Sequence, residues 1–191
     1  MTSRSWRLTR TLLLAACALL ALQSARGAAT RIDVVRDGEV FIIDAVLVAP
    51  VSVREAWAVL TDFDAMSRYV PDLESSRITA RAGTRLTVEQ RGTARWGLLA
   101  LSFQTVREVQ LVPFERVTSH VVGGSLRRVD TLTRLATVAD GTEIRHHIEL
   151  MTESWLPDFV IEGFLRAEVR QQFDALEREM RRRRSVSGLP P

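Results

Sequence analysis

The histidines are the side chains best suited to acid–base chemistry in this chain, and it has three, at positions 120, 146 and 147. Adjacent residues on a β-strand point to opposite faces, so His146 and His147 cannot bind one metal ion together. No metal site is expected. His146 lies in the apolar phase of its segment and is the candidate general base of an enzyme, or more simply a hydrogen-bonded histidine in the wall of a core or pocket.

The carboxylates are scattered. Asp62 and Asp64 in "TDFD" fit turn and cap positions better than a catalytic pair. Asp130 in "RRVDTLTR" can pair with Arg128 or Arg134, and an inward Asp130 or Arg134 can instead bind a ligand head group.

An enzyme that uses His146 as its base would need Tyr69 or Asp130 as a donor or orienting group. The sequence contains no Gly-x-Ser-x-Gly elbow, phosphate-binding loop, dinucleotide fingerprint or His-Glu-x-x-His motif. We therefore expect no cofactor, and we favour binding over catalysis.

The positive charge is concentrated at the two ends of the chain. All 26 basic residues are arginines, set against 23 acidic residues. Four arginines precede residue 30 and four more form the run Arg181 to Arg184, so the body between them is mildly acidic. Such a body lacks the basic surface that nucleic-acid binding requires. The arginine run is either a solvated helix end or a transient contact with an anionic membrane.

Residues 1–29 have the pattern of a secretory signal peptide, in which an arginine-rich start precedes the apolar run "TLLLAACALLALQS" and small residues. Export would make the protein periplasmic or secreted. Its only cysteine, Cys17, would leave with the signal, and the mature chain would form no disulfide. A lipoprotein anchored through Cys17 of "LAAC" and a retained membrane helix are the alternatives.

The body predicts one strand, two short helices, about six strands and one long helix. Residues 39–48 form the first strand, Ser52 caps a helix that ends before Asp62, and Pro71 makes the chain extended. Short runs separated by glycine turns follow, including the hairpin signal Asp140-Gly141. From residue 158 to 180 an apolar stripe predicts an amphipathic helix, and residues 181–191 are expected to be a disordered basic tail. The stripe consists of Ile161, Leu165, Val169, Phe173, Leu176 and Met180.

This order of elements, together with "AWAVLTDFDAMSRYVPDL", resembles the START-like or SRPBCC superfamily of polyketide cyclases, coenzyme-Q-binding proteins and lipid carriers. The matching residues are Pro50, Ala56, Trp57, Leu60, Asp62, Phe63, Met66, Tyr69 and Pro71. The resemblance implies an α+β helix-grip domain over residues 30–180. In that fold a curved antiparallel sheet of about seven strands surrounds the C-terminal helix, two short helices follow the first strand, and an apolar cavity lies between sheet and helix.

The alternation of apolar residues predicts the wall of this cavity, with the two short helices as its lid. Gly163 either opens space beside the sheet or permits close packing against a strand, and the apolar faces can alternatively meet and leave no cavity. The expected function is an exported carrier of a lipid, quinone or polyketide-like molecule, and the alternative is a cyclase or dehydratase. The predicted ligand contacts are Tyr69, Leu86, Val88, Trp96, Leu99, Leu101, Phe103, Ile144, His146, Ile148, Ile161, Leu165 and Val169.

Overall fold

The computed structural model describes residues 30–151 and 156–187. The expected signal segment with Cys17, and residues 188–191, lie outside the described residues. Within the described part, no helix is both long and apolar enough to cross a membrane.

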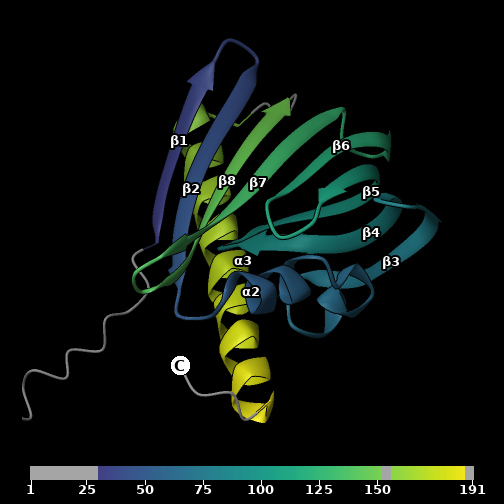
Figure 1. The fold of residues 1–191 in the computed structure, drawn as a ribbon. Helices are drawn as coiled ribbons and strands as arrows, with labels where there is room; N and C mark the ends of the chain where they lie inside the picture. Colours follow the sequence, from purple (N-terminus) through teal and green to yellow (C-terminus); the bar gives the residue numbers. More distant parts are fainter. Residues whose placement is uncertain (1–29, 152–155, 188–191) are drawn as a thin grey trace, which may run out of the picture.

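A single antiparallel sheet of eight strands curves around one long helix, α3 (Figure 1). The order across the sheet is β1-β2-β8-β7-β6-β5-β4-β3, so β1 and β3 form its two edges. This is the helix-grip arrangement that the sequence predicted, with one strand more than expected. The strands are β1 (Arg31–Asp37), β2 (Val40–Ala49), β3 (Leu73–Ala82), β4 (Arg85–Trp96), β5 (Leu99–Val112), β6 (Arg116–Gly124), β7 (Arg128–Val138) and β8 (Gly141–Met151).

The additional strand is β1, which forms a hairpin with β2. Ile32 and Val34 alternate with charged residues and are both buried. Gly38 has a φ of 60°, the left-handed conformation that glycine adopts at little cost and that tight hairpin turns require. The pattern of an amphipathic edge strand followed by a turn was therefore already present in the sequence.

Two short helices follow β2 and cover one end of the sheet, as the sequence predicted (Figure 1). Helix α2 (Val53–Leu60) begins with a capping box, in which the backbone N–H of Glu55 donates to Ser52 Oγ and the N–H of Ser52 donates to the Glu55 carboxylate. The 3-10 helix η1 (Phe63–Arg68) comes next, and the backbone N–H of Ile78 in β3 donates to the side chain of Asp64. Asp64 therefore fixes the approach of η1 to the sheet edge.

Helix α3 (Asp158–Ser187) packs its predicted apolar stripe against the sheet. Its residues Ile161, Val169, Phe173 and Met180 are buried in the main core. The helix continues through the arginine run, so the expectation of a disordered tail from residue 181 is wrong as far as Ser187. Arginine is a good helix former, and Arg182 and Arg183 both pair with Glu179 one turn earlier, which stabilises this last part of the helix.

Candidate functional site

A cavity of about 400 Å³ lies between the concave face of the sheet and α3. Its helix side is formed by Ile161, Phe164 and Leu165, and the short helices close one end with residues that include Leu60 and Met66. The prediction of a hollow interior with a largely apolar wall is confirmed, and a cavity of this size is in the range of small-molecule sites.

Part of the predicted ligand-contacting set lines this cavity, namely Leu101, Phe103, Ile144, His146, Ile161 and Leu165. The predicted strand parity is thus correct for β8, where Ile144 and His146 face inward. His147 points to the opposite face of β8, where its Nδ1 lies 2.8 Å from the Asp44 carboxylate.

The other predicted contacts lie elsewhere. Leu86 and Val88 are 1% exposed and do not line the cavity; they pack in a second core cluster with Phe63, which does line it. Ile148 and Val169 belong to the main core. The side chain of Leu99 is outside the described part of the chain. Parity assigns a residue to a face of the sheet, but it does not distinguish a residue packed under a neighbour from one that borders a cavity.

Trp96, at the end of β4, packs its ring against α3 at Gly163 and does not line the cavity. A Cβ atom at Gly163 would lie 3.1 Å from Trp96 Cη2, closer than nearly all real contacts of this kind. Of the two interpretations of Gly163, the structure therefore supports close packing against a strand. The indole remains 38% exposed, so it covers the helix without being enclosed.

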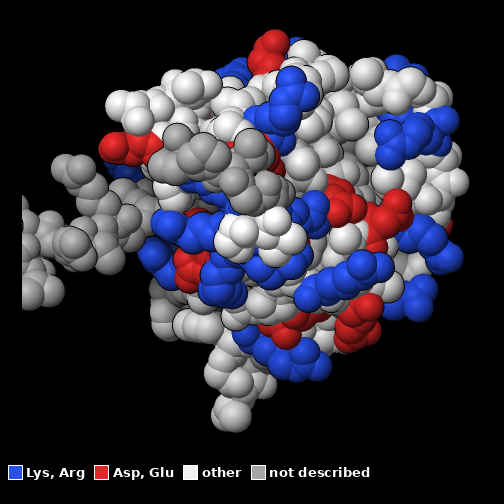
Figure 2. Space-filling model, turned by 60° about the horizontal axis from the view of Figure 1, so that its bottom comes forward, with Lys and Arg blue, Asp and Glu red and all other residues white. Residues whose placement is uncertain are grey.

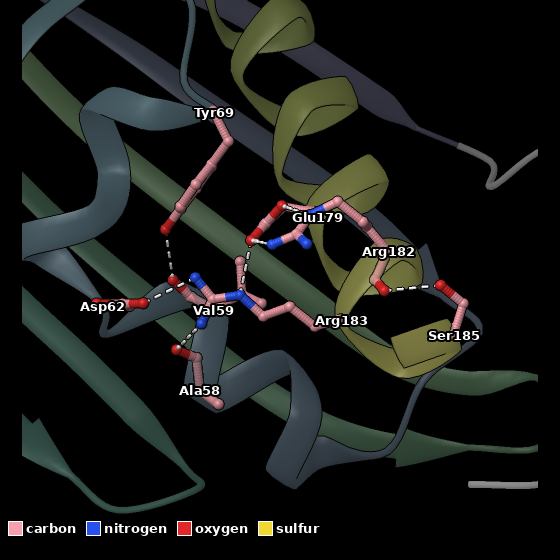
Figure 3. A network of polar contacts seen from close by, with 8 residues as sticks. All are labelled: Ala58, Val59, Asp62, Tyr69, Glu179, Arg182, Arg183 and Ser185. Atoms are coloured by element: carbon pink, nitrogen blue, oxygen red, sulfur yellow. Dashed lines mark hydrogen bonds and ion pairs between the residues drawn. The ribbon is translucent and has the colours of Figure 1, made fainter. Parts of the chain in front are cut away.

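Tyr69 belongs to a polar network that fastens the end of α3 to the short helices (Figure 3). Its hydroxyl donates to the backbone carbonyl of Val59 at 3.0 Å, and its ring lies 5.7 Å from the Arg183 guanidinium. Burial raises the pKa of Tyr69 to about 12. Because its hydroxyl already donates to Val59 and its pKa is high, Tyr69 has a structural role here and is not placed to donate to a ligand.

Arg183 is the centre of this network, which we call the lid clamp and define as Asp62, Tyr69, Glu179 and Arg183 (Figure 3). Its guanidinium donates to Asp62 of the lid and to Glu179 of its own helix, each at 2.7 Å. Hydrogen bonds from Arg182 and Arg183 lower the pKa of Glu179 to about 2, so this buried carboxylate is ionised at neutral pH. Asp62 therefore holds the end of α3, whereas Asp64 accepts from the backbone of β3. The two acids have separate structural partners and do not act as a pair.

His146 is neutral at pH 7. Burial, followed by the positive charges of Arg107 and His147, lowers its pKa to about 4. Its Nδ1 lies 2.8 Å from the Thr133 hydroxyl, and its ring lies 6.0 Å from that of Phe173 on α3. A histidine in this state is a weak base but a good neutral hydrogen-bonding group.

Asp130 and Arg134 do not face the cavity. Asp130 pairs with Arg128 at 2.6 Å on the exposed side of β7, and Arg134 is also exposed. The structure therefore does not bring His146, Tyr69 and Asp130 together. The head-group role proposed for an inward Asp130 or Arg134 is wrong, because both residues occupy the outward phase of their strand.

The charged residue that does line the cavity on the sheet side is Arg107 in β5, which the sequence reasoning missed. It donates to Gln90 Oε1 at 3.0 Å and to Ser119 Oγ at 2.6 Å, and burial lowers its pKa to about 10. The signal was available, because Arg107 has the same parity as Phe103 and Val109, two apolar residues of the inward face. Charged residues are rarely buried, so an arginine in the apolar phase of a strand indicates a site that needs its charge or its hydrogen bonds.

Glu168 and Gln172 line the cavity from α3, and the Gln172 amide donates to Glu168 Oε1 at 2.7 Å. Burial raises the pKa of Glu168. Among the described residues no group of three or more histidine, cysteine or acidic side chains is placed to hold a metal ion. The site can therefore offer a ligand a largely apolar wall with polar groups on the sheet and on α3.

Solved structures with the same fold come from several bacteria. The aromatase/cyclase ZhuI of a Streptomyces species has a TM-score of 0.66 at 13% sequence identity, covering 78% of this chain and 98% of that one. A START superfamily protein from Mycobacterium smegmatis has a TM-score of 0.64 at 12% identity, covering 74% of this chain and 97% of the other.

A STAR-related lipid transfer protein from Xanthomonas axonopodis has a TM-score of 0.59 at 13% identity, covering 78% of this chain and 98% of the other. No curated protein matches the sequence at a significant level. The family model described as polyketide cyclase/dehydrase and lipid transport matches residues 49–177, which include both short helices and most of α3. The chain therefore belongs to the polyketide cyclase/dehydrase and lipid transport family, whose members' functions fit the binding of a hydrophobic ligand or polyketide cyclisation.

Proposed function

We propose that this protein is a carrier for a hydrophobic small molecule, of the lipid, quinone or polyketide-like class, held between the sheet and α3. The observation that carries the proposal is the cavity of about 400 Å³ with mainly apolar walls. A structural neighbour named as a lipid transfer protein supports the same assignment. The polar groups are a minority of the cavity lining. The Thr133 hydroxyl lies 2.8 Å from His146 Nδ1, but a histidine with a pKa of about 4 is a weak base for activating it.

Carriage takes place after export in this proposal. Its support is the sequence of residues 1–29, with an arginine-rich start, an apolar run and small residues. Mass spectrometry of the mature N-terminus tests it. Cleavage after Gly27 or Ala29 is the expected result, whereas a diacylglyceryl group on Cys17 would show a lipid-anchored protein instead.

The carrier role is tested by native mass spectrometry of the protein purified from the periplasm of its own source, followed by organic extraction. We expect a lipid-sized adduct that leaves on extraction and can be identified in the organic phase. A protein that is consistently free of adduct, and that also fails to bind apolar probes added afterwards, would rule out the carrier role.

A cyclase or dehydratase is the second candidate, because His146 and Arg107 line the same cavity wall and a structural neighbour is an aromatase/cyclase. His146→Ala separates the two functions. An enzyme would lose turnover while retaining its ligand, whereas a carrier would bind as before. The low pKa of His146 makes it a weak base at neutral pH, which favours the carrier.

A further inference from the structure

A line of polar side chains crosses the largely apolar concave face of the sheet. It takes one residue from each of the five adjacent strands β4 to β8, and we call it the polar belt: Gln90, Arg107, Ser119, Thr131 and His146. All five line the cavity. Hydrogen bonds join four of the five residues, since Arg107 donates to Gln90 and Ser119 and lies 3.5 Å from Thr131 Oγ1. The fifth, His146, feels the positive charge of Arg107.

The charge of Arg107 is not neutralised by the described part of the protein. Its hydrogen-bond partners are an amide and two hydroxyl groups, and its buried Nε has no partner. No ion pair includes it among the described residues. Since its pKa stays at about 10, the guanidinium remains positive at neutral pH. A buried charge without a counter-ion is unfavourable, and such charges in proteins are usually paired.

Glu168 does not serve as the counter-ion, although it lines the same cavity. It accepts a hydrogen bond from Gln172 at 2.7 Å, and the charge that acts on it is that of Asp72, which raises its pKa. The pKa of Arg107 in turn is shifted by burial alone, with no contribution from an acid. The positive charge on the sheet and the acid on the helix therefore occupy separate parts of the site.

We propose that the ligand is an amphiphile with a single carboxylate, bound with its acidic head on Arg107 and its apolar body along Ile161, Phe164 and Leu165 of α3. This inference rests on the proposed carrier function and adds the chemical class of the ligand. A guanidinium presents a planar set of donors that fits a carboxylate, and charge-assisted hydrogen bonds are the stronger ones. Neutral His146, next to Arg107, adds a hydrogen-bonding group without a competing positive charge.

The test compares three probes with the same tail and different heads, namely dodecanoate, dodecanol and dodecylamine, by isothermal titration calorimetry at pH 7.5 below their aggregation concentrations. We expect the wild-type protein to bind dodecanoate about ten times more tightly than dodecanol, and dodecylamine most weakly. Arg107→Met should remove the preference for dodecanoate while dodecanol binds as before. Arg107→Lys should keep part of it, because the charge remains but the planar fork is lost.

Arg145→Met is the matched control, because Arg145 is on strand β8 of the same sheet, pairs with Glu143 on the outer face and has a side chain that is 65% exposed. It should leave all three affinities unchanged. Equal affinity for dodecanoate and dodecanol in the wild-type protein would overturn the head-group inference and leave the carrier function standing. Failure of all three probes to bind would overturn the carrier function as well.

A second measurement begins with the wild-type protein alone and so does not require that a variant folds. In a thermal unfolding experiment on the wild-type protein, dodecanoate should raise the Tm more than an equal concentration of dodecanol, since only the bound species stabilises the folded state. The same experiment without ligand should give Arg107→Met a higher Tm than the wild type, because the uncompensated charge has been removed. A lower Tm for this variant would show that the belt satisfies Arg107 without a ligand, and would contradict the inference.

Discussion

His146 links the chemistry of the cavity to the stability of the fold. Burial, Arg107 and His147 hold its pKa at about 4, well below the value of about 6.5 for an unfolded histidine. Between these two values the unfolded chain binds more protons than the folded one, so the free energy of unfolding rises with pH. This stabilisation is complete above about pH 6.5 and is lost as the pH falls to about 4.

Between pH 7 and pH 4 we therefore expect the free energy of unfolding of the wild-type protein to fall by about 3 kcal/mol more than that of a His146→Gln variant. Urea unfolding at a series of pH values measures the difference. His147, whose pKa is raised mainly by its hydrogen bond to Asp44, is present in both proteins, so its opposite contribution cancels in the comparison. Parallel pH profiles for the two proteins would contradict the assignment of a neutral, buried His146.

The sequence predicted the inward position of His146 but not the identity of its charged neighbour. Alternation along β8 was enough for His146, because apolar residues on both sides fix the phase of that strand. Arg107 was missed because it is adjacent to Glu108, so that β5 carries charge in both phases and lacks the regular alternation of β8. The hydrogen-bond acceptors of Arg107 lie on three other strands. The register in which these strands pair cannot be read from one sequence.

The lid clamp joins elements that are more than a hundred residues apart in the chain. Replacing Arg183 by Met should lower the free energy of unfolding by about 2 kcal/mol, because it leaves the buried Glu179 and the lid residue Asp62 with fewer donors. Chemical denaturation measures the change. The matched control is Arg181→Met, which removes only an i,i+4 pair with Glu177 within the same helix and should cost less than about 0.5 kcal/mol.

The clamp also makes the lid dependent on the end of α3. If Arg183 fastens the lid, Arg183→Met should speed the release of a bound apolar probe several-fold in a stopped-flow displacement assay, whereas Arg181→Met should not. Equal release rates in the two variants would show that the clamp contributes to stability without controlling access to the cavity.

At the level of elements, features set by residues close in sequence were predicted correctly, whereas features set by contacts between distant parts of the chain were not. The helix cap at Ser52, the stripe of α3 and the hairpin at Asp140-Gly141 depend on residues close in sequence, and all three were predicted. Strand β1 was missed because it is short and only two of its three apolar residues, Ile32 and Val34, are buried, and their burial depends on α3. The end of α3 was placed too early because its last turns are stabilised by Asp62, a residue of the lid.

At the level of the molecule, contact of the arginine run with an anionic membrane remains a proposal. Figure 2 shows the molecule with the bottom of Figure 1 turned forward, and on this face acidic residues lie among the basic ones. Arg181 pairs with Glu177, Arg182 and Arg183 share Glu179, and Arg184 donates to the carbonyl of Pro50. The positive charge left to act on a membrane is therefore smaller than four arginines suggest.

We expect weak, salt-sensitive binding to vesicles that contain anionic lipid, and we expect Arg181→Gln combined with Arg182→Gln to abolish it. These two side chains are 49% and 63% exposed. Their replacement removes the hydrogen bonds of Arg182 to Glu179 but leaves the pairs of Arg183 with Asp62 and Glu179 in place. Cosedimentation at 20 and 300 mM salt measures the effect. Binding of the double variant equal to that of the wild type would exclude the arginine run as the membrane contact.

The open sheet leaves two rims where another chain could add a strand. On the β1 rim, Arg166 of α3 donates to the backbone carbonyl of Ile32 and so occupies one of the free acceptors. On the β3 rim, two breaks in register and the outward charges of Arg77 and Arg81 disturb the regular ladder that strand addition needs. The protein can thus keep a long sheet unclosed around its cavity without offering a template for fibril growth.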